Sequence, residues 1–311
     1  LTSQNSFAGE TREAGDRFGE SLAAGDINGD GYDDLAIGVP AEDLGAAIDA
    51  GCVNAIYGSA SGLDLTTGET WSQDTGGIAD LPTTGDRFGE RLVIGDFDRA
   101  TTTSYDEHDL AISVTGEDSG ALQNAGAVHV IYGYPGIGLS DLGAQMLRRP
   151  GGSLEGEQFG ATLHAADLDG DGLDDLAVKS VGGDFVAPPG LPSSGAVYLF
   201  LGRQSAPLRA SGRAPWYPDG GACIDLAVEA ENFGSSLTSG DFDGDGLVDL
   251  AIGIKGWTDD AAVVAAPGAE GDHLELLAGC PARAGQDGST CLHLHRSPRW
   301  CGAFRQPRAG T

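Results

Sequence analysis

Methionine, basic residues and long apolar runs are all scarce in this chain of 311 residues. One methionine stands against 51 glycines, which favours turns and short strands over helices. Lysine and arginine total 17 against 47 acidic residues, a formal net charge of -30. Such a surface repels nucleic-acid phosphates and anionic membranes. No apolar run approaches the roughly 20 residues of a membrane-spanning helix. We therefore expect no nucleic-acid partner and no membrane insertion in this chain.

Familiar catalytic motifs are also missing. The sequence contains no GxSxG elbow, no HExxH pair and no phosphate-binding GxxxxGK[ST] loop. Its five cysteines lie at irregular spacing, which fits neither a disulfide framework nor a standard zinc pattern. We therefore predict that the chain is not an enzyme.

A repeated motif organises most of the chain. A Phe-Gly pair begins at Phe18, Phe88, Phe159 and Phe233, and the first aspartate of an acidic loop follows eight residues later in each copy. An "LAIG"-type stretch comes next, and in three copies a second apolar stretch follows: "AGCVNAIYG", "AGAVHVIYG" and "SGAVYLFLG". These stretches predict strands, about four to a unit. Because such a small sheet cannot bury both of its faces alone, radial repetition of blades is favoured.

The acidic loops have the spacing of a calcium site. In "GDINGDGYDDLAIG", oxygen-bearing side chains alternate at loop positions 1, 3, 5 and 9, and position 7 offers a backbone carbonyl, which are the hard oxygen ligands that Ca²⁺ requires. An EF-hand is excluded because position 12 carries no glutamate and the flanking segments are strand-like. The predicted ligands are Asp26, Asn28, Asp30, Tyr32 (carbonyl) and Asp34 in the first loop, Asp167, Asp169, Asp171, Leu173 (carbonyl) and Asp175 in the third, and Asp241, Asp243, Asp245, Leu247 (carbonyl) and Asp249 in the fourth.

The second loop departs from this pattern. Asp96 and Asp98 match positions 1 and 3, and Asp109 precedes "LAIS" as position 9 should, but position 5 has no equivalent. Its ability to bind calcium therefore stays open. Asp33 and Asp174 fall at position 8, outside the ligand pattern, and we expect them to face solvent.

The Phe-Gly pair, the Gly-Asp step, the DxDGDGxxD-type loop and the LAIG stretch together resemble the FG-GAP repeat. That repeat builds the β-propeller of integrin α subunits and occurs in glycosylphosphatidylinositol-specific phospholipase D. The resemblance implies an all-β fold, a β-propeller of four-stranded antiparallel blades with calcium in the loops. It also implies an extracellular setting, secreted or at the cell surface.

The same resemblance implies a ligand-binding or cell-adhesion scaffold. Its protein or glycan ligand would lie on the face opposite the calcium loops, formed by Pro40–Gly51, Thr115–Gly126 and Ser180–Gly195. The alternative is a non-catalytic accessory propeller of a secreted hydrolase of the phospholipase D type.

Repeat register divides the chain into two parts. Residues 1–260 hold about four repeat units, fewer than the seven blades of the family's ring, which predicts an incomplete ring. After "LAIGIKGWTDDAAVV" no stretch of the usual third-strand pattern appears, so we expect the fourth unit to lack its third strand. From Ala261 to Thr311, five arginines stand against four acidic residues. We therefore predict an out-of-register, disordered tail over residues 261–311.

Overall fold

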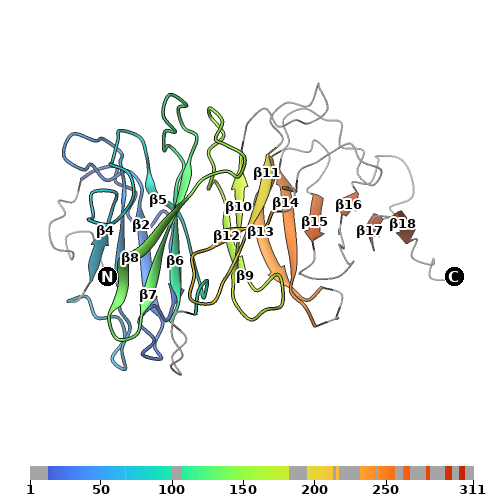
Figure 1. Cartoon of the computed structure of the whole chain (residues 1–311), viewed down its shortest axis with the longest axis horizontal. Helices are drawn as coiled ribbons and strands as arrows, with labels where there is room; N and C mark the ends of the chain where they lie inside the picture. The colour runs from blue at the N-terminus through green and yellow to red at the C-terminus, as the bar shows by residue number, and fades with distance from the viewer. Residues whose placement is uncertain are drawn as a thin grey trace.

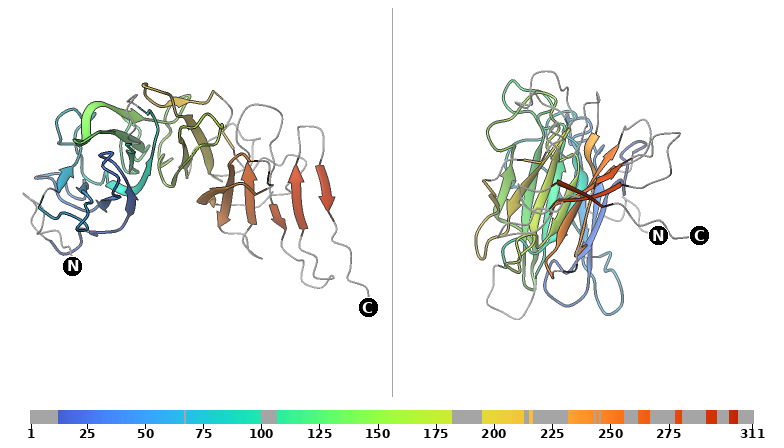
Figure 2. Two further views of the ribbon diagram at one scale, coloured as in Figure 1. Left: turned by 90° about the horizontal axis from the view of Figure 1, so that it is seen from below. Right: turned by 90° about the vertical axis from the view of Figure 1, so that its right-hand side faces the viewer.

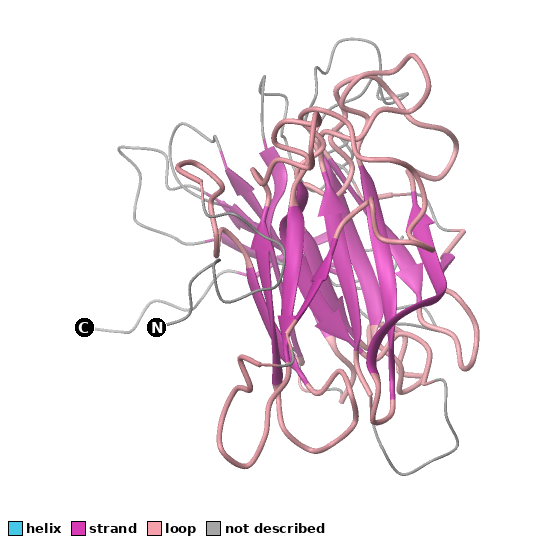
Figure 3. Cartoon of the chain, turned by 90° about the vertical axis from the view of Figure 1, so that its left-hand side faces the viewer, coloured by secondary structure: helices cyan, strands magenta, loops and turns pink. Residues whose placement is uncertain are grey.

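The computed structural model describes residues 13–66, 68–99, 107–181, 195–212, 215–216, 232–242, 244, 246–255, 262–266, 278–280, 291–295 and 301–304. Every helix or strand element in these ranges is a β-strand (Figure 1, Figure 3). No helix in the described part of the chain is long and apolar enough to cross a membrane. The all-β prediction is confirmed.

The strands form five antiparallel sheets in sequence order. The first sheet holds β1 (Leu22–Gly25), β2 (Asp34–Val39), β3 (Cys52–Ile56) and β4 (Glu69–Trp71). The second holds β5 (Phe88–Gly95), β6 (Asp109–Val114), β7 (Ala127–Tyr134) and β8 (Gly138–Leu147). The third holds β9 (Leu163–Ala166), β10 (Asp175–Ser180), β11 (Ala196–Leu201) and β12 (Arg209–Ala210). Each is a four-stranded meander, the blade that the repeats predict.

The fourth sheet corrects one prediction. It consists of β13 (Asn232–Gly240), β14 (Asp249–Lys255) and β15 (Ala262–Ala266), and β15 pairs with β14 from Ile254↔Ala262 to Leu250↔Ala266. A third strand therefore follows "LAIGI", and the sheet extends past residue 260. Beyond it, β16 (Ala278–Cys280), β17 (Cys291–His295) and β18 (Cys301–Phe304) form a three-stranded sheet within the segment predicted to be a disordered tail.

The second sheet packs large residues of β6 against the preceding sheet and a small residue of β6 against the following sheet. Leu110 and Ile112 of β6 are fully buried against Ala36 of β2, in the core between the first two sheets. Ala111, on the opposite face of β6, packs with Leu176 of the third sheet. The alternation along "LAI" therefore serves both faces of a blade, because successive strand residues point to opposite sides.

Glycine before the third strand lets the next Phe-Gly pair approach. Gly126 has φ +78, and a Cβ there would lie 2.4 Å from the backbone N and O of Phe159. The amide of Phe159 donates to the carbonyl of Ala125 at 2.9 Å, and the fully buried phenyl ring fills the core between sheets two and three. Gly51 contacts Phe88 in the same way between sheets one and two. We call this close contact, of Gly51 with Phe88 and of Gly126 with Phe159, the glycine contact between blades. It explains why the small-Gly step and the Phe-Gly pair recur together.

The sheets follow one another along a curved row, and the first sheet and β16–β18 lie at its opposite ends (Figure 2). The curvature comes from the stacked blades of a propeller, and the row does not close on itself. The structure is therefore an incomplete β-propeller, as the number of repeats predicts.

Candidate metal centre

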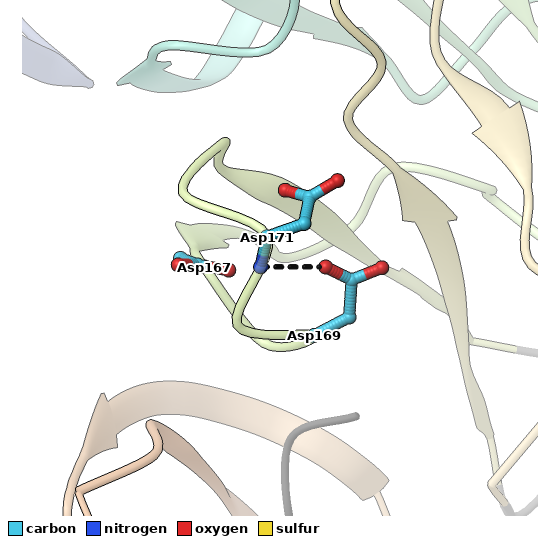
Figure 4. Close-up of side chains that lie close together, drawn as sticks. All are labelled: Asp167, Asp169 and Asp171. Atoms are coloured by element: carbon cyan, nitrogen blue, oxygen red, sulfur yellow. Dashed lines mark hydrogen bonds between the residues drawn. The ribbon is translucent and has the colours of Figure 1, made fainter. Parts of the chain in front are cut away.

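The third acidic loop gathers three carboxylates on one turn between β9 and β10. Oxygens of Asp167, Asp169 and Asp171 all lie within 4.8 Å of one another (Figure 4). A cation with oxygen ligands at about 2.4 Å spans that separation, because two ligands on opposite sides of it stand about 4.8 Å apart. Asp171 is exposed and the other two are half-buried, so an ion can enter from solvent. The geometry and the all-oxygen donor set can hold a metal ion.

Backbone amides curl the loop around the first aspartate. Asp167 Oδ1 accepts from the amide of Gly170 at 2.7 Å, and Oδ2 accepts from the amide of Gly172 at 3.0 Å. The fourth loop repeats both bonds from Asp241 to Gly244 and Gly246. In the first loop the amide of Gly31, at position 6, donates to Asp26 Oδ2 in the same way, but Oδ1 accepts from the amide of Asp30, at position 5. These three loops share one turn, which the glycines permit through their left-handed φ angles.

The aspartate at position 9 is buried at the end of each acidic loop, where it accepts hydrogen bonds from backbone amides. Asp34 accepts from the amides of Ile27 at 2.8 Å and Gly58 at 2.7 Å, which ties the loop to the turn after β3. Asp109 and Asp175 make the equivalent pair of bonds in the second and third units. Asp249 accepts from the amide of Phe242 at 2.9 Å. All four are at most 5% exposed, so this carboxylate has a structural role in each unit.

Burial of these carboxylates is electrostatically costly. Desolvation raises the pKa of Asp175 to about 7; the Gly202 amide acts against this, and the neighbouring Asp169 and Asp171 raise it further. Burial likewise raises the pKa of Asp34 and, more strongly, that of Asp109. A cation in the loop favours the ionised form of each carboxylate near it. The crowded negative charge of the loop and a bound cation are therefore complementary.

The first and second loops are also held by the following blade. The amide of Asp26 donates to His108 Nδ1 at 3.1 Å, and the amide of His108 donates back to the carbonyl of Asp26 at 2.8 Å. Asp174 repeats this arrangement with Asp96, through its Oδ2 at 3.1 Å and its own amide at 2.7 Å. The prediction that Asp174 faces solvent is therefore wrong, because position 8 reaches the preceding loop. Asp33, in the first unit, is exposed as predicted.

In the second loop an arginine contacts the first aspartate. Arg99 Nε and Nη2 donate to Asp96 Oδ2 at 3.0 and 2.8 Å, and the Arg99 amide donates to Oδ1 at 2.9 Å. The same Nη2 donates to the carbonyl of Gly172 in the third loop at 2.6 Å. Arg99 is not among the predicted site residues, although a basic residue inside an acidic loop is the signal that could have found it.

The four loops differ in how the structure places their predicted ligands. The third loop brings Asp167, Asp169 and Asp171 together. In the first loop, the side-chain oxygens of Asp26 and Asn28 both accept from the amide of Asp30, at 3.0 Å each. In the fourth loop, Asp243 and Asp245 lie outside the described residues. The carbonyl ligands assigned to Tyr32, Leu173 and Leu247, and a ligand role for Asp98 and Asp109, stay predictions.

Comparison with known families agrees with this geometry. The model of the FG-GAP repeat matches residues 18–51, 159–200 and 233–272. The chain contains FG-GAP repeats. The three matches contain the first, third and fourth acidic loops, and the second unit, whose loop holds Arg99, lies outside them. The third match ends at residue 272, beyond β15, which supports the correction to the fourth unit.

Curated relatives carry similar repeats. The chain is 31% identical over 188 residues to phosphatidylinositol-glycan-specific phospholipase D of Rattus norvegicus, covering 59% of this chain and 20% of the relative. It is 32% identical over 200 residues to integrin alpha-PS5 of Drosophila melanogaster, covering 62% and 16%, and 30% identical over 169 residues to integrin alpha-X of Mus musculus, covering 48% and 13%. The matched region is about a fifth or less of the length of these relatives.

Proposed function

We propose that this chain is a calcium-binding, extracellular β-propeller segment that acts as a non-catalytic scaffold for ligand binding or cell adhesion. The observation that carries the proposal is the Asp167–Asp169–Asp171 cluster, built on a turn that recurs in the first and fourth loops. Ca²⁺ is the cation favoured by a set of carboxylate, amide and carbonyl oxygens. When bound, the ion would neutralise the loop and fix the entry into the second strand of each blade. The similarity to integrin α chains supports the adhesion role.

The opposite face offers a firm surface for a protein or glycan ligand. Its loops are closed by short bridges, Leu44↔Ala47 in the first unit and Ser119↔Leu122 in the second. The next unit holds each loop through three backbone hydrogen bonds. In the first unit, the amides of Gly85, Arg87 and Phe88 donate to the carbonyls of Ile48, Asp49 and Ala50, and in the second unit the amides of Gly156, Gln158 and Phe159 donate to the carbonyls of Gln123, Asn124 and Ala125. Because such loops lose little freedom on binding, they suit recognition. Of the third predicted loop, Ser180–Gly195, residues 182–194 lie outside the described residues.

The second candidate function is an accessory propeller of a secreted hydrolase. It is favoured by the similarity to phosphatidylinositol-glycan-specific phospholipase D, an enzyme by its name. The two candidates share the calcium loops and differ in what the rest of the protein does. A search of the complete coding sequence for a catalytic module or for adhesion modules separates them.

Calorimetric titration with calcium tests the proposal directly. We expect Asp169→Ala to weaken binding in the third loop about tenfold or more, because it removes both side-chain oxygens of one member of the carboxylate cluster. Asp33→Ala is the matched control, since it removes the same charge from an exposed position 8 and should leave binding nearly unchanged. Absence of calcium binding to the wild-type chain at millimolar concentration, where extracellular modules bind, would refute the proposal.

A further inference from the structure

We propose that the guanidinium group of Arg99 takes the place of a metal ion in the second loop, so that this loop is held without calcium. Among the described residues of this loop, no three carboxylates converge as they do in the third loop. The comparison with the other loops rests on the proposed calcium function, whereas the Arg99–Asp96 ion pair stands on its own.

The position of Arg99 supports this role. It is the fourth residue of its loop, counted from Asp96, where the other loops carry Gly29, Gly170 and Gly244. Its φ angle of 35 is positive, as are the angles of 67, 73 and 80 at those glycines. Its amide donates to Asp96 Oδ1 at 2.9 Å, as the amide of Gly170 donates to Asp167 at 2.7 Å. The second loop therefore begins with the same turn, but this turn carries a long cationic side chain.

The side chain then occupies the first ligand. In the third loop, Asp167 Oδ2 accepts from the amide of Gly172, two residues beyond the fourth position. In the second loop, Asp96 Oδ2 accepts from Arg99 Nε and Nη2 instead, at 3.0 and 2.8 Å. The Asp96 side chain is only 10% exposed, so the pair is partly shielded from water. A calcium ion at this carboxylate would meet the charge of the guanidinium at close range and be repelled.

The residue at position 5 agrees with a single positive charge. Counted from Asp96, this position is Ala100, which has no carboxylate. Asp109, at position 9, accepts from the amides of Phe97 and Gly133 as Asp34 and Asp175 do in their own loops, so the difference lies at the start of the loop. A monovalent guanidinium neutralises Asp96 without needing the three converging carboxylates that the third loop provides.

Arg99 also links two neighbouring loops. Its Nη2 donates to the carbonyl of Gly172 at 2.6 Å, which lies between the predicted ligands Asp171 and Leu173. Asp174 adds a second link, through its hydrogen bond from the amide of Asp96 at 3.1 Å. The internal cation therefore fixes its own loop and positions the backbone of the adjacent calcium loop.

Thermal melting in chelator tests the metal-free role. Arg99→Gln removes the charge, and Arg209→Gln is the control because Arg209 is exposed on β12 and loses the same charge. We expect Arg99→Gln to melt about 2–4 °C below the control, the shift that one ion pair produces in a domain of this size. Equal melting temperatures for the two variants would overturn the proposal.

Calcium stoichiometry supplies the second measurement. Asp98→Ala removes the side-chain oxygens at position 3, which calcium in the second loop would need. Because the proposal places no calcium there, the number of ions bound should stay at the wild-type value. Asp169→Ala should lower calcium binding in the same titration. If Asp98→Ala loses one bound ion, the second loop is a calcium site and the proposal is wrong. If the wild type binds no calcium, the proposed function fails, while the melting comparison still decides the role of Arg99.

Discussion

The aspartate at position 9 combines two tasks at one residue. Asp175 is fully buried, and its oxygens hold the amides of Leu168 and Gly202, which join the loop to the end of β11. The sequence predicts a metal ligand here because of the carboxylate and its spacing. It does not predict the two hydrogen bonds, because they depend on where a strand more than 20 residues away ends.

His129 gives a prediction at the same scale. Burial lowers the pKa of this imidazole on β7 from 6.5 to about 4; Arg148 lowers it further, while Asp80 acts in the opposite direction. The folded pKa lies below the unfolded one, so the stability that the neutral ring allows is present above pH 6.5 and is lost as the pH falls toward 4. Over that window the loss is about 3 kcal/mol.

Urea unfolding of the wild type and of His129→Leu between pH 4 and 7, in chelator, checks this expectation. The imidazole lies against the ring of Phe88, with ring centroids 5.6 Å apart, and leucine keeps that position apolar. The difference in unfolding free energy between the two proteins should shift in favour of the variant as the pH falls. A constant difference across the range would mean that His129 titrates normally in the folded state.

At the scale of the element, most strands follow from the repeat. The "LAIG"-type stretches and the later apolar stretches such as "VIYG" predict β2, β3, β6, β7, β10 and β11, because short apolar runs rich in β-branched and aromatic residues and bounded by glycine are typical of buried strands. β15 was missed because "AVVAA" lacks the glycine and aromatic residues that mark the third strand elsewhere. Its strand state depends on pairing with β14, a tertiary contact that overrides its weak local pattern.

The glycine contact between blades can be tested at Gly126 by one pair of substitutions. Gly126→Ala places a methyl group 2.4 Å from the backbone of Phe159, which cannot move aside as a flexible side chain would. Gly120→Ala is the control, because its φ of +65 carries the same left-handed strain with no atom within 4 Å. Each variant bears about 1–2 kcal/mol of backbone strain.

Urea unfolding should show Gly126→Ala to be the less stable of the two by a further 1–3 kcal/mol, roughly the cost of overpacking. If the two variants unfold at the same urea concentration, the close approach of neighbouring blades does not constrain this position.

At the scale of the whole molecule, the described residues of the open row leave the first sheet without a preceding sheet. The first sheet buries Ile37 and Ile56 in a small cluster with Phe18 and Leu35, the residues that in later units pack on a preceding blade. Leu22 of β1 is 61% exposed beside it. Exposed strand edges and apolar faces promote association.

We therefore expect the chain, made alone, to self-associate. Sedimentation should show a mass that rises with protein concentration, and Leu22→Lys should lower the association by placing charge on the exposed edge. Leu81→Lys is the control, because Leu81 is 71% exposed outside the sheets. A monomer at all concentrations would show that the ends of the row are covered in solution.

The central claim is that the acidic loops of these FG-GAP repeats bind calcium and that the ion stabilises the stacked blades. The most direct test is the melting temperature of the full chain in calcium and in chelator. At ten times the dissociation constant, each occupied site adds about 1.4 kcal/mol by mass action. Several occupied loops therefore predict a rise of several degrees that follows the calcium concentration. A melting temperature that is the same in calcium and in chelator would contradict the account.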